Sequence, residues 1–96
     1  MLVLVCYDVN TETAAGRRRL RQVAKKCESY GQRVQKSVFE CLIEPEMYLK
    51  LEHDLVQIMD QSVDSLRIYF LNEEMRRKTR VFGISRVIDP EAPIVL

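Results

Sequence analysis

The first strand expected in the chain, over residues 2–7, is apolar on both of its sides. Successive side chains of a strand point to opposite faces of a sheet. The two sets here are Leu2, Leu4 and Cys6 on one side and Val3, Val5 and Tyr7 on the other. A sheet built around this strand has to be covered on both faces, because soluble monomers rarely expose apolar patches larger than about a few hundred Å².

Two amphipathic helices are expected to supply part of that cover. The first, over residues 14–30, follows N-cap candidates at 10–13 and ends at Gly31, a natural C′ residue. The second begins at Pro45, which suits the first turn of a helix. Apolar residues repeat at helical spacing on one face of each, namely Leu20, Val23, Ala24 and Cys27, then Tyr48, Leu51, Leu55, Ile58 and Met59.

The other segments are typical of strands and loops. Residues 32–43 are rich in strand formers, but their alternation fails near Gln35 and Lys36, which predicts a bulge or a tight turn between two strands. A strand over 66–71, a basic loop over 75–80 and a short strand somewhere within 81–88 follow.

This order predicts an α+β, ferredoxin-like βαββαβ domain spanning residues 1–96, with an additional short C-terminal strand. Two helices can cover only one face of the antiparallel sheet. We therefore expect a second copy on the other face, which makes a homodimer. Residues 81–96 end in an apolar segment, and we expect them to pack on the partner subunit.

The charges are segregated along the chain, although the net charge is only +1. Residues 1–36 carry eight Lys or Arg and three Asp or Glu, residues 37–75 carry two and nine, and residues 76–96 carry five and two. Such a distribution either presents a surface for a polyanion or produces two solvated faces of opposite sign.

Several classes of function are disfavoured by the same sequence. The longest uncharged apolar run has seven residues, which is too short to span a membrane. Three cysteines without a C-x-x-C pair are typical of buried, reduced thiols and of the cytoplasm. The three glycines are not clustered, so no glycine-rich phosphate loop is present.

Asp8 closes the apolar first strand and needs an explanation. Near a dimer axis, two Asp8 carboxylates would repel each other unless they shared a proton or a divalent cation, and Mg²⁺ commonly takes one or two carboxylates and keeps several waters. Alternatively, Asp8 caps the following helix or pairs with an arginine within residues 17–21.

Several motifs together resemble the CRISPR-associated protein 2 family. They are Tyr7-Asp8-Val9 at the end of the first strand, the arginine-rich first helix, RVQKSVFE at 33–40 and SLRIY at 65–69. The block GQRVQKSVFEC is most similar to members that accompany type I-C systems.

This resemblance implies a ferredoxin-like homodimer that works in spacer acquisition. Such a dimer bridges two dimers of the CRISPR integrase, CRISPR-associated protein 1, and binds double-stranded DNA. Family members are also described as metal-dependent endonucleases on single-stranded RNA or double-stranded DNA. Asp8 would hold Mg²⁺ or Mn²⁺, and the further catalytic candidates are Tyr7, Ser37 and Phe39.

The nucleic-acid-binding candidates are all basic: Arg17, Arg18, Arg19, Arg21, Arg33, Arg76, Arg77 and Lys78. Which arginines within 17–21 match the family positions is ambiguous, and these residues could also form an ordinary solvated helix face. Phe39 is either a packing residue or a functional one. Two functions remain open at this point: a metal-dependent phosphodiesterase, and a non-catalytic DNA-binding scaffold.

Overall fold

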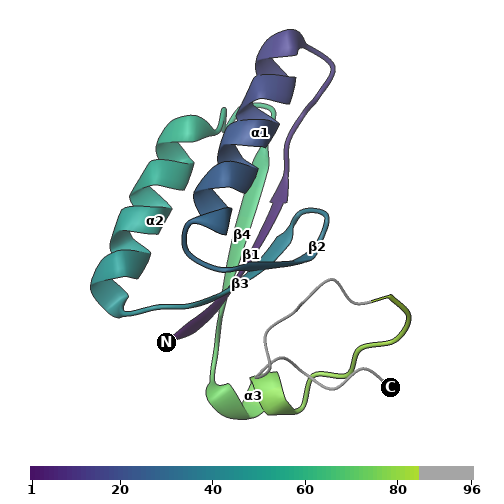
Figure 1. Ribbon diagram of the computed structural model, residues 1–96. Coiled ribbons are helices and arrows are strands. Elements are labelled where there is room, and N and C mark those ends of the chain that lie inside the picture. The colour runs from purple at the N-terminus through teal and green to yellow at the C-terminus, as the bar shows by residue number, and fades with distance from the viewer. Residues whose placement is uncertain (85–96) are drawn as a thin grey trace.

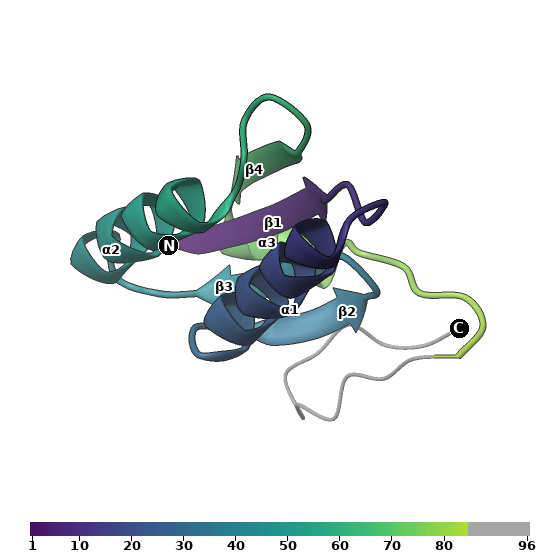
Figure 2. The same cartoon turned by 90° about the horizontal axis from the view of Figure 1, so that it is seen from above.

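The computed structural model describes residues 1–84. The elements are β1 (Leu2–Asp8), α1 (Ala14–Glu28), β2 (Gln32–Gln35), β3 (Val38–Leu42), α2 (Pro45–Ile58), β4 (Ser65–Leu71) and α3 (Glu73–Arg77). The strands form one antiparallel sheet in the order β2-β3-β1-β4. Helices α1 and α2 pack beside each other and against this sheet (Figures 1 and 2). The predicted α+β, ferredoxin-like arrangement is confirmed.

β1 lies in the interior of the sheet, where the side chains of β3 and β4 flank its apolar side chains. It pairs with β3 and β4, so that Val5 lies opposite Phe39 on one side and Ile68 on the other. These residues face the helices, and Val5 and Phe39 are fully buried. The rest of the core beneath α1 and α2 comprises Val3, Tyr7, Val9, Val23, Cys27, Cys41, Tyr48, Leu51 and Leu55.

The irregularity expected near Gln35 is a tight turn together with a shift of register. Residues 36–37 form the turn between β2 and β3, and the pairing shifts between Arg33 and Gln35. Both features predicted from the broken alternation are therefore present.

Gly31 does not end α1 in the predicted way. The C-cap is Ser29, and among the described glycines only Gly83 has a positive φ. A Cβ atom at Gly31 would instead collide with the carbonyl oxygen of Glu40 and with the Sγ atom of Cys41. Glycine is required here because the chain after α1 passes very close to β3, not because the backbone is left-handed.

The basic segment predicted as a loop over 75–80 begins with a short helix, α3. The side chain of its N-cap residue, Asn72, accepts a hydrogen bond from the Met75 amide at 2.8 Å. Two acidic residues occupy its first turn and two basic residues its last turn, which suits the helix dipole. The strand predicted within 81–88 and the tail expected to pack on a partner lie largely outside the described residues.

The sheet face opposite α1 and α2 remains partly bare. Leu42 and Tyr69 lie on this open face with 52% and 43% of their surface exposed. Its other members on β1, β3 and β4, taken from the pairing register, are Leu2, Leu4, Cys6, Asp8, Val38, Glu40, Ser65, Arg67 and Leu71. No helix within residues 1–84 is long and apolar enough to cross a membrane.

The three cysteines are free, as expected. Cys27 and Cys41 are buried in the core, and burial raises the pKa of the Cys27 thiol to about 12 and that of Cys41 to about 11. Thiols that remain protonated are poor nucleophiles. Cys6 is half-buried on the open face.

Candidate metal and nucleic-acid site

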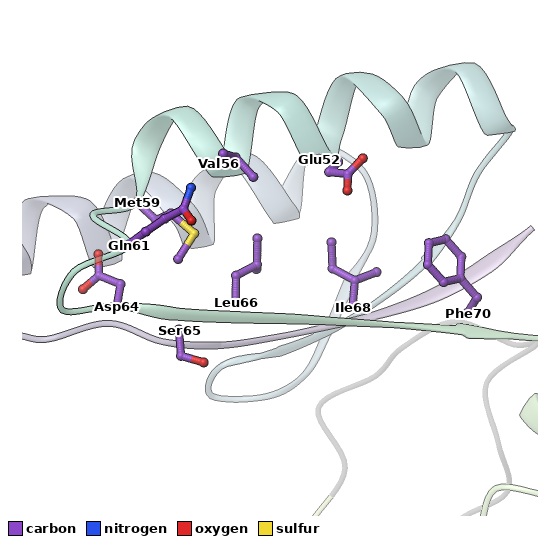
Figure 3. A pocket seen from close by; sticks show the side chains of 9 residues that line it. All are labelled: Glu52, Val56, Met59, Gln61, Asp64, Ser65, Leu66, Ile68 and Phe70. Atoms are coloured by element: carbon purple, nitrogen blue, oxygen red, sulfur yellow. The ribbon is translucent and has the colours of Figure 1, made fainter.

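Asp8 is the last residue of β1, and its side chain belongs to the open face. It lies opposite Ser65 of β4 in the ladder, and residues paired in this way share a face. Figure 3 shows Leu66, Ile68 and Phe70 pointing from β4 towards α2, whereas Ser65 points away from it. The Asp8 carboxylate is therefore presented away from the helices, and the residue is exposed.

The two structural alternatives for Asp8 are wrong. The N-cap of α1 is Thr13, whose hydroxyl accepts a hydrogen bond from the Gly16 amide at 3.0 Å. The arginine-to-aspartate pair near this end of the sheet joins Arg19 to Asp64 instead. Within residues 1–84, no hydrogen bond or ion pair engages the Asp8 carboxylate, so it is available to a ligand.

A single protomer offers few ligands for a metal. No group of three or more His, Cys, Asp or Glu side chains able to hold an ion forms within residues 1–84. None of the three grooves described for this part of the chain is lined by Asp8. The groove of about 510 Å³ between α2 and β4 lies on the other face of the sheet (Figure 3).

Tyr7, Phe39 and Arg33 form a cluster on the side of the sheet that faces the helices. The rings of Tyr7 and Phe39 stack with centroids 6.2 Å apart, and the Arg33 guanidinium lies 5.1 Å from the centroid of the Phe39 ring. Arg33 also pairs with Glu28 at 3.5 Å. Burial raises the pKa of Tyr7. The structure therefore does not bring these three predicted site residues together with Asp8.

Ser37 lies closer to the end of β1. It occupies the turn between β2 and β3, and its carbonyl oxygen accepts a hydrogen bond from the Tyr7 amide at 3.1 Å. The end of β1 is thus flanked by Ser37 of this turn on one side and by Ser65 of β4, the ladder partner of Asp8, on the other.

The first basic group lies at the same end of the sheet as Asp8, because only five residues separate β1 from α1. Arg17, Arg18 and Arg21 are exposed, and the Arg17 Nη1 atom donates to the carbonyl of Thr11 at 3.1 Å. Arg19 differs from them. Its side chain is only 18% exposed and is paired with Asp64, so Arg19 is held in the fold in a way that the other three arginines are not.

The second basic group, Arg76, Arg77 and Lys78, lies at the opposite end of the sheet. α3 follows β4, whose last residue, Leu71, is paired with Leu2 (Figure 1). The length of β1 separates this group from Asp8, a distance of about 20 Å at 3.3 Å per residue. Arg76 lines a groove with Glu40, and Lys78 pairs with Glu74 at 3.0 Å. One protomer therefore presents two separate basic surfaces.

Asp64 is the residue near this site that the sequence did not reveal. Among residues 1–84 it is the charged residue that is buried. Two of its partners, Arg19 and Asn10, lie 45 and 54 positions away in the sequence, and no local pattern signals such contacts.

Comparison with known proteins gives one consistent result. The sequence pattern of the family described as CRISPR associated protein Cas2 matches residues 1–79. The CRISPR-associated endoribonuclease Cas2 of Chlorobaculum tepidum is 52% identical over 96 residues, with all of both chains covered. The CRISPR-associated endonuclease Cas2 of Halalkalibacterium halodurans is 45% identical over 95 residues, with 99% of both chains covered.

A solved structure agrees with these sequence relatives. The crystal structure of Streptococcus pyogenes Cas2 superposes with a TM-score of 0.79 at 54% sequence identity. The similarity covers 86% of this chain and 100% of that one. Given matches of this extent in both sequence and fold, the chain belongs to the CRISPR associated protein Cas2 family.

Proposed function

We propose that this protein is a metal-dependent endonuclease that hydrolyses phosphodiester bonds during CRISPR spacer acquisition. The observation that carries this proposal is the exposed Asp8 carboxylate at the end of the central strand, which has no partner among the described residues 1–84. Exposed Arg17, Arg18 and Arg21 lie at the same end of the sheet. Relatives named endoribonuclease and endonuclease support the same class of reaction.

Asp8 fits a magnesium ion in its chemistry and in its exposure. Mg²⁺ prefers oxygen ligands, is content with one or two carboxylates and keeps several waters. When bound, such an ion polarises a phosphoryl oxygen and lowers the pKa of a bound water. The part of the protein is to present the carboxylate, while Arg17, Arg18 and Arg21 bind the phosphates of the substrate.

Removal of the metal tests this proposal. With Mg²⁺ or Mn²⁺ present, the purified protein is expected to cleave single-stranded RNA or double-stranded DNA. An excess of EDTA should abolish cleavage, and added Mg²⁺ should restore it, because the site holds its ion through few protein ligands. Cleavage that persists in EDTA, with both substrates supplied, would contradict a metal-dependent reaction.

We further propose that two copies associate through the open face. The exposed Leu42 and Tyr69 side chains would become covered there, and the Asp8 carboxylates of both copies would lie on the shared seam. A site with one carboxylate per protomer would then gain a second one. The two basic groups, which lie far apart in one protomer, would be duplicated along the outer rim of the dimer.

Replacing Tyr69 with glutamate is expected to weaken this dimer at least 100-fold, since a carboxylate would be buried in the seam in place of an aromatic ring. Tyr69 is already 43% exposed in the protomer, so the fold itself should tolerate the change. Leu49→Glu on α2 is the matched control, because Leu49 is 62% exposed away from the open face. Sedimentation at several concentrations measures both variants. A wild-type monomer at micromolar concentration would contradict the dimer.

A non-catalytic scaffold is the second candidate function. The finding that favours it is the absence, within residues 1–84, of any group of three metal-ligating side chains. In this function the dimer bridges two dimers of CRISPR-associated protein 1, and its exposed arginines follow the backbone of the DNA duplex without reading its sequence. Binding would persist and cleavage would be absent in every variant.

A further inference from the structure

Asp64 is a buried carboxylate near the end of β1, where Asp8 lies. Its side chain has no exposed surface, and it occupies the short connection between α2 and β4 (Figure 3). A buried charge is costly unless it is paired and hydrogen-bonded, so its presence calls for a specific set of partners.

Those partners use both carboxylate oxygens. Oδ1 accepts from the Asn10 amide at 2.9 Å and from Arg19 Nη2 at 3.4 Å. Oδ2 accepts from Arg19 Nε at 2.8 Å and from the Asp60 amide at 2.9 Å. With two donors on each oxygen, Asp64 has little capacity left to bind a metal ion. It acts on the site through the groups that it holds.

Asp64 holds backbone groups that are next to Asp8 in the chain or in the sheet. Asn10 follows Asp8 by two residues, and Ser65, the residue after Asp64, is the ladder partner of Asp8. The first turn of α1 packs closely against the loop that contains Asn10, since a Cβ atom at Gly16 would collide with the Asn10 carbonyl. The Asp8 side chain has no hydrogen bond of its own within residues 1–84, so its position depends on this backbone.

We propose that Asp64, together with Arg19, is the positioning pair that fixes the Asp8 carboxylate for ligand binding. This inference rests on the proposed function. It also separates Arg19 from its neighbours, because Arg17, Arg18 and Arg21 meet the nucleic acid while Arg19 acts through Asp64. Groups that orient a metal ligand typically change metal affinity by about 10- to 100-fold when they are removed.

The test compares Asp64→Asn and Arg19→Gln with two controls in the full-length protein. Cys41→Ala perturbs the core at the other end of β1, where Cys41 is paired with Val3. Arg18→Gln removes an exposed arginine from the same helix. Two measurements are made below the melting temperature of every variant: Mn²⁺ binding by electron paramagnetic resonance, and hydrogen exchange of the amides of residues 8–10.

Asp64→Asn and Arg19→Gln are expected to weaken Mn²⁺ binding about tenfold and to accelerate exchange at residues 8–10 about tenfold. Cys41→Ala should change neither quantity, and Arg18→Gln should weaken only nucleic-acid binding. Unchanged exchange in Asp64→Asn, or equal changes in Cys41→Ala, would overturn the positioning role. If the wild type does not bind Mn²⁺, or binds it no more tightly than Asp8→Ala, the metal-dependent function fails, and the exchange data still decide the role of Asp64.

Discussion

Asp8→Ala is expected to reduce cleavage at least about 100-fold while folding and duplex binding remain as in the wild type. A bound metal contributes several kcal/mol of transition-state stabilisation, and each 1.36 kcal/mol corresponds to a factor of ten in rate. The fold should not respond, because the Asp8 side chain is exposed and makes no hydrogen bond or ion pair within residues 1–84. Loss of activity would then report on the site alone.

This measurement also separates the two candidate functions. Cleavage of RNA or duplex DNA is followed with and without Mg²⁺, and duplex binding is followed in parallel. Arg18→Gln serves as the counterpart, because it should weaken binding in proportion to the lost phosphate contact and make the affinity less dependent on salt. Equal cleavage by wild type and Asp8→Ala, or none by either, would support the scaffold.

The fold could be predicted because its signals are local and agree with one another. The continuous apolar run of β1, the 3.6-residue stripe of α1 and Pro45 at the start of α2 each specify one element. Their order leaves few arrangements other than the split βαβ sheet. The open face could be predicted as well, because two helices cannot cover both sides of β1.

The details that could not be predicted depend on contacts between distant segments. The pattern predicts Gly31 as the C′ residue that glycine commonly supplies after a helix, whereas the structure needs it for a close approach to β3. α3 could have been found, since Asn72, two glutamates and two arginines form a regular capped turn. The run of basic residues over 75–80 was interpreted as a loop instead.

The candidate site shows the same division. Asp8 was identified because a carboxylate at the end of an apolar strand is conspicuous in the sequence. The roles of the neighbouring arginines were not separable, since four basic residues in five positions look alike until one of them is found beside Asp64. Likewise, Tyr7 and Asp8 are adjacent in the chain but face opposite sides of the sheet. Residues that are adjacent in the sequence therefore do not all belong to one compact site within a protomer.

Asp64→Ala is expected to destabilise the fold by about 3 kcal/mol at neutral pH, because it leaves Arg19 and two backbone amides without their buried acceptor. For a domain of this size, the melting temperature should fall by about 12 to 24 °C. Asp54→Ala is the control. Asp54 pairs with Lys26 at 3.4 Å near the surface, and such pairs contribute about 1 kcal/mol or less.

The same carboxylate should make the stability of the wild type depend on pH. Burial by itself would raise the pKa of Asp64, but the hydrogen bonds from Arg19, Asp60 and Asn10 outweigh it and hold the pKa below its ordinary value. A carboxyl whose pKa is lower in the folded state stabilises the fold above its unfolded pKa, about 3.9, and this contribution is lost as the pH falls through the folded pKa. Melting temperatures from pH 7 down to pH 2 should therefore converge for wild type and Asp64→Ala, whereas a constant gap between the two curves would mean that Asp64 stabilises the fold by packing rather than by its charge.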